Sequence, residues 1–186
     1  INISTMAGGV YNSGTAKLTD CSIDAFTYGI KNTNGTITTN HTSIEITSSG
    51  DAIYASAGTV NLISGSTVSG GPGDITAIRC TGSSILNVNT TTVTSKYAGE
   101  YSDHDAVISH SGTGTINLQG GSSVTNNNVA FAVHVSNQAS ITIESGANIY
   151  AKKGHAVGSR SSKNPSIVMH GGFIKGEASG TCGILL

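Results

Sequence analysis

Short apolar motifs return along the whole chain, and a polar run follows each of them. Eight of these motifs are a small residue followed by Val or Ile: Gly9-Val10, Gly29-Ile30, Ala52-Ile53, Ala77-Ile78, Ala106-Val107, Ala132-Val133, Ala156-Val157 and Gly183-Ile184. A second motif follows each of the first seven and ends on one apolar residue: Ile23, Ile44, Val68, Val93, Val124, Ile149 and Ile174. Successive copies lie 20 to 31 residues apart. A repeat of this length buries its apolar face only by stacking on its neighbours, so the sequence predicts a solenoid.

One repeat, DAIYASAGTVNLISGSTV, shows what each unit contains. Ile53 starts a short strand, and Val60 and Leu62 alternate with polar residues at the period of two that a strand requires. Val68 begins a third strand, and the turns between the strands are rich in Gly, Ser and Ala. The second strand recurs in the other repeats, with Ile37, Leu86 and Val88, Ile116 and Leu118, Ile141 and Ile143, and Ile167 and Met169.

Three short strands in each repeat predict an all-β, single-stranded, right-handed parallel β-helix of about eight rungs. Stacked rungs lie ~4.8 Å apart in the hydrogen-bonding direction. The composition fits a thin apolar column with polar outer faces, because hydrophobic residues make up 37% and charged residues 10% of the chain. No linker interrupts the repeat, so we expect residues 1–186 to form a single β-helix domain. The chain starts and stops in mid-repeat, and we expect it to be a fragment or processed part of a longer secreted polypeptide.

Charge and cysteines add few constraints. The net charge of −1 gives no general attraction to nucleic acid, and no apolar run has transmembrane length, so we expect neither a nucleic-acid partner nor a membrane-embedded protein. Cys21, Cys80 and Cys182 fall in rungs too far apart for a disulfide. Cys80 follows Ile78 by two residues and is expected to point into the core.

The residue after each first-strand apolar residue is expected to point outward. This rule gives a mixed, long-side-chained column: Tyr11, Lys31, Tyr54, Arg79, Ile108 and His134. The column is either a binding face or ordinary outer decoration. The same register places Asp51 and Asp105 at one rung position two rungs apart, and it shows no cluster of acids and arginines on adjacent rungs.

The segment that joins the third strand to the next first strand varies most in length, and it is longest after Val93. Insertions in solenoids often carry the binding surface. Residues 94–105 contain tyrosines among charged side chains, a mixture that suits contact with a protein. A solvated loop, a metal site and an acid–base site remain open alternatives for this segment. Its candidate binding residues are Tyr97, Glu100, Tyr101, Asp103, His104 and Asp105.

A second candidate surface is cationic. No acidic residue occurs between Glu144 and Glu177, whereas this stretch contains Lys152, Lys153, Arg160, Lys163 and Lys175. Lys152, Lys153 and Lys175 are expected at the same inter-rung loop position, about 5–10 Å from one another. Such a patch suits a sulfated glycan or an acidic receptor face, although a face that serves only solubility is the alternative.

The motifs GDAIYASAGTVNLISGSTVSG and MHGGFIKG resemble the passenger domains of bacterial autotransporters. Those domains are right-handed parallel β-helices secreted by Gram-negative bacteria, and the resemblance covers nearly the whole chain at the level of repeat motifs. It implies a secreted or outer-surface virulence protein that binds a host cell-surface receptor or glycan. A released, growth-factor-like agonist of an endothelial receptor is an alternative within the same family. The resemblance assigns no individual functional residue.

Two further classes remain as alternatives. A polysaccharide-active β-helix enzyme needs several carboxylates that converge on one cleft. No such group is visible in the sequence, and the histidines lack zinc-ligand spacing. We therefore expect no enzyme activity, no catalytic residue, no metal and no cofactor. A self-associating structural solenoid is the other alternative.

Overall fold

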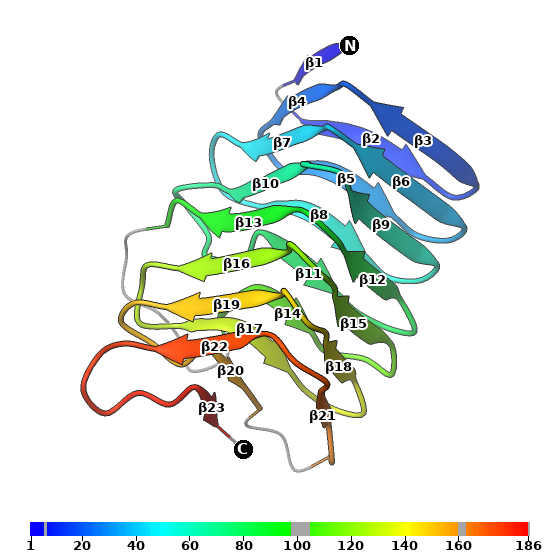
Figure 1. Cartoon of the computed structure of the whole chain (residues 1–186). Helices are drawn as coiled ribbons and strands as arrows, with labels where there is room; N and C mark the ends of the chain where they lie inside the picture. Colours follow the sequence, from blue (N-terminus) through cyan, green and yellow to red (C-terminus); the bar gives the residue numbers. More distant parts are fainter. Residues whose placement is uncertain (6, 98–104, 160–162, 186) are drawn as a thin grey trace.

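The computed structural model of this protein describes residues 1–5, 7–97, 105–159 and 163–185. Within these residues the chain forms short β-strands joined by turns, with no helix. Figure 1 shows the strands stacked along one axis, with the N-terminus and the C-terminus at opposite ends of the stack. Every strand pair is parallel, and the described strands form three sheets. The predicted all-β parallel β-helix is therefore confirmed.

Within the described residues, each of the first seven rungs contributes one strand to each sheet, and the last rung contributes strands to sheets A and B only. Sheet A contains β1 (Asn2–Thr5), β4 (Ser22–Ala25), β7 (Ser43–Ile46), β10 (Thr67–Gly70), β13 (Thr92–Ser95), β16 (Ser123–Asn126), β19 (Asn148–Ala151) and β22 (Phe173–Gly176). Sheet B contains β2 (Gly8–Asn12), β5 (Tyr28–Asn32), β8 (Asp51–Ala55), β11 (Ile78–Cys80), β14 (Ala106–His110), β17 (Phe131–Val135), β20 (Val157–Gly158) and β23 (Ile184–Leu185). Sheet C contains β3 (Thr15–Thr19), β6 (Thr36–Asn40), β9 (Thr59–Ile63), β12 (Ile85–Val88), β15 (Thr115–Leu118), β18 (Ser140–Ile143) and β21 (Ser166–Met169).

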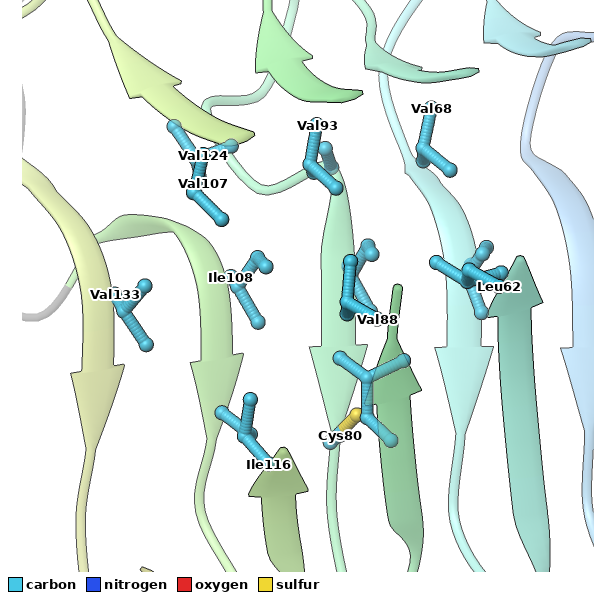
Figure 2. Close-up of a cluster of buried hydrophobic side chains, with 14 of the residues drawn as sticks. Leu62, Val68, Cys80, Val88, Val93, Val107, Ile108, Ile116, Val124 and Val133 are labelled. Carbon is cyan, nitrogen blue, oxygen red and sulfur yellow. The ribbon is translucent and has the colours of Figure 1, made fainter. Parts of the chain in front are cut away.

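The inward residues form continuous columns, because residues of like character pair from rung to rung. Val68 pairs with Ile44 on one side and with Val93 on the other. In sheet C, Leu86 pairs with Val60 and with Ile116. These residues are almost fully buried, and Figure 2 shows side chains from the three sheets meeting in the interior. The stacking therefore buries the apolar motifs as predicted.

Steric crowding explains why a small residue precedes Val or Ile in the repeated motif. In β5, Gly29 and Ile30 are both buried between the outward residues Tyr28 and Lys31. A Cβ atom on Gly29 would lie 2.4 Å from Cγ2 of Ile44, so only a minimal side chain fits there without movement. The motif thus reflects the corner at which a third-strand side chain packs against a first strand.

The register predicted for the fifth first strand is wrong by one residue. β14 pairs Ile108 with Ile78 and with Val133, so Val107 rather than Ala106 occupies the position of the small residue. Val107 and Ile108 are both fully buried, and Ser109 takes the outward position that was predicted for Ile108. This pairing hides two large apolar side chains and exposes a hydroxyl, which the hydrophobic effect favours. The predicted common rung position of Asp51 and Asp105 fails for the same reason.

The three cysteines are free. Cys80 is fully buried, as expected, and burial raises the pKa of its thiol to about 12. Cys21 is also buried, whereas Cys182 is half-buried in the last rung.

Candidate functional site

Two outward columns run along sheet B. The first contains Tyr28, which pairs with Asp51. The second contains, in rung order, Tyr11, Lys31, Tyr54, Arg79, Ser109 and His134, of which His134 is buried rather than exposed as predicted. Because two buried residues separate the outward positions of β5 and of β8, each of these two rungs presents a pair of side chains side by side. The pairs Tyr28 with Lys31 and Asp51 with Tyr54 therefore face solvent on adjacent rungs.

A pocket of about 240 Å³ opens between these two rungs. Its lining consists of Thr27, Tyr28, Lys31, Gly50, Asp51 and Tyr54. The tyrosines supply flat apolar walls with polar tips, and Lys31 and Asp51 supply opposite charges. A concave surface with a few convergent polar groups is the usual form of a ligand site.

Lys31 is held over the faces of both tyrosines. Its Nζ atom lies 5.7 Å from the ring centroid of Tyr28 and 5.8 Å from that of Tyr54. Both distances lie within the range in which an ammonium is attracted to an aromatic face. The three side chains are half-buried, so the cation has a defined place at the pocket.

The carboxylate of Asp51 is fixed from the next rung by Arg79. Arg79 Nε donates to Oδ1 and Oδ2 of Asp51 at 3.1 and 2.9 Å, and a terminal Nη atom donates to Asp74 Oδ2 at 3.4 Å. Asp74 also accepts a hydrogen bond from the backbone N–H of Thr76 at 3.0 Å. Through this network, Asp74 in the connection before β11 is linked to Asp51, which lines the pocket described above.

The environment shifts the pKa of both members of the ion pair. Burial raises the pKa of the Asp51 carboxyl, and the hydrogen bond and charge of Arg79 oppose that shift without cancelling it. Burial disfavours the charge on Arg79, but the hydrogen bond and charge of Asp51, with Asp74 and Asp105, outweigh it and raise the pKa of the guanidinium. Arg79 thus keeps its charge, and Asp51 has a carboxyl whose ionisation depends on its partner.

The connecting segments explain why the face is open at these rungs. Residues 26–27 and 47–50 join sheet A to β5 and β8, and they are short. From the next rung onward the residues in the position of Tyr28 and Asp51 are buried, namely Thr76, Ala106 and Phe131. The pocket therefore occupies the part of sheet B where both outward columns remain accessible.

Part of the predicted loop site lies outside the described residues, namely Glu100, Tyr101, Asp103 and His104. Tyr97 is half-buried, and its carbonyl accepts a hydrogen bond from the Asn128 side chain. Asp105 is half-buried, and its carbonyl accepts a hydrogen bond from the Phe131 backbone at 3.1 Å. The charge of Asp105 acts on Arg79, which connects this end of the loop to the Asp51 network.

The cationic residues do not share one loop position. Lys152 and Lys153 are exposed after β19, but Lys175 pairs in register with Tyr150 on the outer face of sheet A. Its Nζ lies 5.8 Å from the Tyr150 ring centroid and 3.3 Å from Glu177 Oε1. The predicted loop position of Lys175 is wrong, because the β22 register makes Lys175 a strand residue, although Lys175 and Lys152 both act on the charge of Glu177. Lys163 is exposed, and Arg160 lies outside the described residues.

Sequence reasoning identified the column of Lys31, Tyr54 and Arg79 but missed Tyr28 and the network of Asp51, Arg79 and Asp74. Tyr28 precedes the Gly29-Ile30 motif, and a strict two-residue alternation does not reveal that Tyr28 and Lys31 face the same side. Asp51 precedes Ala52-Ile53 in the same way. The signal that could have found these residues is the motif itself, because the residues immediately before and after it face the same side.

Comparisons with family models, with curated proteins and with solved structures found no match to this chain. The parallel β-solenoid fold is thus established by the geometry itself. Across the part of the chain that the structure describes, no helix is long and apolar enough to cross a membrane. The same residues contain no group of three His, Cys, Asp or Glu side chains arranged to hold a metal ion.

Proposed function

We propose that this chain is an extracellular recognition module of the autotransporter-passenger type, which binds a receptor or glycan on the surface of host cells. The observation that carries the proposal is the pocket of Tyr28, Lys31, Asp51 and Tyr54 on the outer face of sheet B. Aromatic rings beside positioned charges supply rigid contact area together with orientation, as binding hot spots do. The β-helix provides a rigid frame for them, because both rungs are paired on either side.

The repeat motifs supply the second support. They resemble those of secreted passengers, and the parallel β-solenoid is the fold that such motifs require. The secreted or outer-surface location is part of the same proposal. A carboxylate bound by an arginine in the next rung suits a preorganised acceptor for ligand hydroxyl or N–H groups.

Binding of the purified protein to cultured endothelial and epithelial cells tests this proposal. Tyr54→Ala removes one wall of the pocket and is expected to lower saturable binding at least about tenfold. Tyr150→Ala is the matched control, because Tyr150 is an outward tyrosine beside a lysine on sheet A, away from the pocket. Loss of binding in Tyr150→Ala with retention in Tyr54→Ala would move the site to the cationic face of sheet A.

Receptor phosphorylation measured in the same wells separates the two forms of the proposal. Binding with signalling is expected of a released receptor agonist, and binding alone is expected of an adhesin. The absence of saturable binding at micromolar protein would overturn the recognition function on these cells.

A further inference from the structure

The pocket on sheet B combines aromatic rings, an ammonium group and a carboxylate, and together these groups indicate which class of ligand it binds. Its volume of about 240 Å³ is below the range of drug-sized pockets, and one small ring matches it in size. Tyr28 and Tyr54 offer flat faces to the apolar side of such a ring. Lys31 and Asp51 add an electrostatic preference for particular ligand groups.

Lys31 is a cation that lacks a counter-ion within the described residues. No described carboxylate oxygen lies within 4.0 Å of its Nζ atom, which lies instead over the faces of the two tyrosine rings. The other lysines in the described ranges are exposed, whereas Lys31 is half-buried. A half-buried cation with a fixed position and no anionic partner among the described residues binds an anionic ligand group at low cost in ordering.

Asp51 has the opposite role. Arg79 Nε contacts both of its oxygens, yet an ionised carboxylate has about four lone-pair positions. Asp51 lines the pocket, so its remaining positions are available to accept hydrogen bonds from ligand hydroxyl groups. The pairing with Arg79 also keeps Asp51 from neutralising Lys31, so the two charges act on different parts of a ligand.

A ligand that fits all three features has an apolar ring face, hydroxyl groups and one negative charge. We propose that the pocket binds a single sugar residue that carries a carboxylate or a sulfate group. Its anionic group pairs with Lys31, its hydroxyls donate to Asp51, and its ring packs on Tyr28 and Tyr54. The inference rests on the proposed recognition function and narrows it to anionic sugars.

Titration calorimetry with three related oligosaccharides tests the inference: lactose, sialyllactose and sulfated lactose. The wild-type protein is expected to bind at least one anionic form about tenfold more tightly than lactose. Comparison of the carboxylate and sulfate forms shows which anion is preferred. Rising salt is expected to weaken binding of the anionic form, because the charge pair is partly exposed.

Lys31→Met keeps the aliphatic stem over the tyrosines and removes the charge. In this variant the preference for the anionic sugar is expected to disappear while unfolding by circular dichroism stays unchanged. Lys175→Met is the matched control, because Lys175 also lies 5.8 Å from a tyrosine centroid but outside the pocket. The control is expected to keep the wild-type preference.

The failures of the two proposals differ. Binding of lactose as tight as that of both anionic forms, with loss in Tyr54→Ala, would overturn the anionic-sugar inference and leave the recognition function intact. Cell binding that depends on Tyr54 without binding of any of the three sugars would do the same, and it would favour an acidic peptide as ligand. Loss of the preference in Lys175→Met with retention in Lys31→Met would place anion binding on sheet A.

Discussion

Arg79 Nε lies 2.9 Å from Asp51 Oδ2 and thereby joins two neighbouring rungs on the outer face of sheet B. Backbone pairing already aligns the rungs, since Arg79 pairs with Tyr54 in the register of β8 and β11. The ion pair adds a fixed carboxylate at the pocket and connects it to Asp74 at 3.4 Å. One arginine therefore contributes both to the stacking and to the geometry of the candidate site.

Replacement of Arg79 by Leu is expected to destabilise the protein by about 1–2 kcal/mol, measured by urea unfolding at pH 7. The reason is that Asp51 then remains as a half-buried carboxylate without its partner, and burial already raises its pKa. The loss is expected to shrink at acidic pH, where Asp51 is protonated. The double variant Asp51→Asn/Arg79→Leu serves as the control and should recover part of the stability. Equal stability of Arg79→Leu and wild type would show that the ion pair contributes nothing to stacking.

Gly29→Ala is expected to destabilise the protein by about 1–3 kcal/mol. The added Cβ atom would lie 2.4 Å from Ile44 Cγ2 and 2.8 Å from the Ala52 carbonyl oxygen, so the corner has to shift. Ile44→Ala removes the contacting Cγ2 atom and is expected to couple favourably with Gly29→Ala in a double-mutant cycle of thermal unfolding. Additive effects of the two substitutions would contradict this packing of the third strand over the first.

His110 is expected to make stability depend on pH below neutrality. Its ring is buried, Nε2 donates to the Ser84 carbonyl at 2.9 Å, and Nδ1 accepts from the Gly112 N–H at 3.2 Å. Burial lowers the pKa of His110, against an opposing contribution from the Ser84 carbonyl. The unfolded chain, with a histidine pKa of about 6.5, therefore binds the proton first as the pH falls.

Stability that is present above pH 6.5 is thus lost as the pH decreases toward the lowered folded pKa, with a slope of at most about 1.4 kcal/mol per pH unit. His110→Asn places an amide in the column in which Asn12 pairs with Asn32, and it is expected to reduce this slope. Urea unfolding between pH 5 and pH 8 measures the difference between variant and wild type. A slope unchanged by the substitution would assign the pH dependence to other groups.

Thiol labelling is expected to separate the three cysteines by burial. Cys182 is half-buried and should react first with a disulfide reagent at pH 8, whereas Cys80 is fully buried and its thiol has a pKa of about 12. Cys80 should therefore react only when the rungs open, because the thiolate is the reactive form. Cys182→Ser should remove the fastest phase. Rapid labelling of Cys80 in the folded protein would contradict the close packing of the central rungs.

Much of this fold could be predicted from sequence because the inward positions of a solenoid repeat in register. Val60, Leu86, Ile116 and Ile141 show the same alternation, and they stack in one column of sheet C. The turns follow from local chemistry as well, since Gly58 and Gly65 both have positive φ, at 72° and 74°. Stacking, alternation and turn residues all indicated the same coil.

The outer face was harder to predict, because polar side chains carry little register information. In β14 the sequence Ala106-Val107-Ile108 fits two registers, and only tertiary pairing selects Val107 and Ile108 for the interior. Arg79 also reaches across rungs to Asp51 with a long side chain, a contact that strand spacing alone does not reveal. The candidate site therefore depended on the structure more than the core did.

The most direct test of the account is a nuclear magnetic resonance titration of ¹⁵N-labelled protein with sialyllactose and sulfated lactose. Concentration-dependent shifts are expected to centre on Thr27 to Lys31 and Gly50 to Tyr54, the residues that surround the pocket. Amides of sheet C, such as that of Asn87, should stay unchanged. Shifts confined to Lys152, Lys153 and Lys175, or the absence of shifts in a protein that binds cells, would contradict a binding pocket on sheet B.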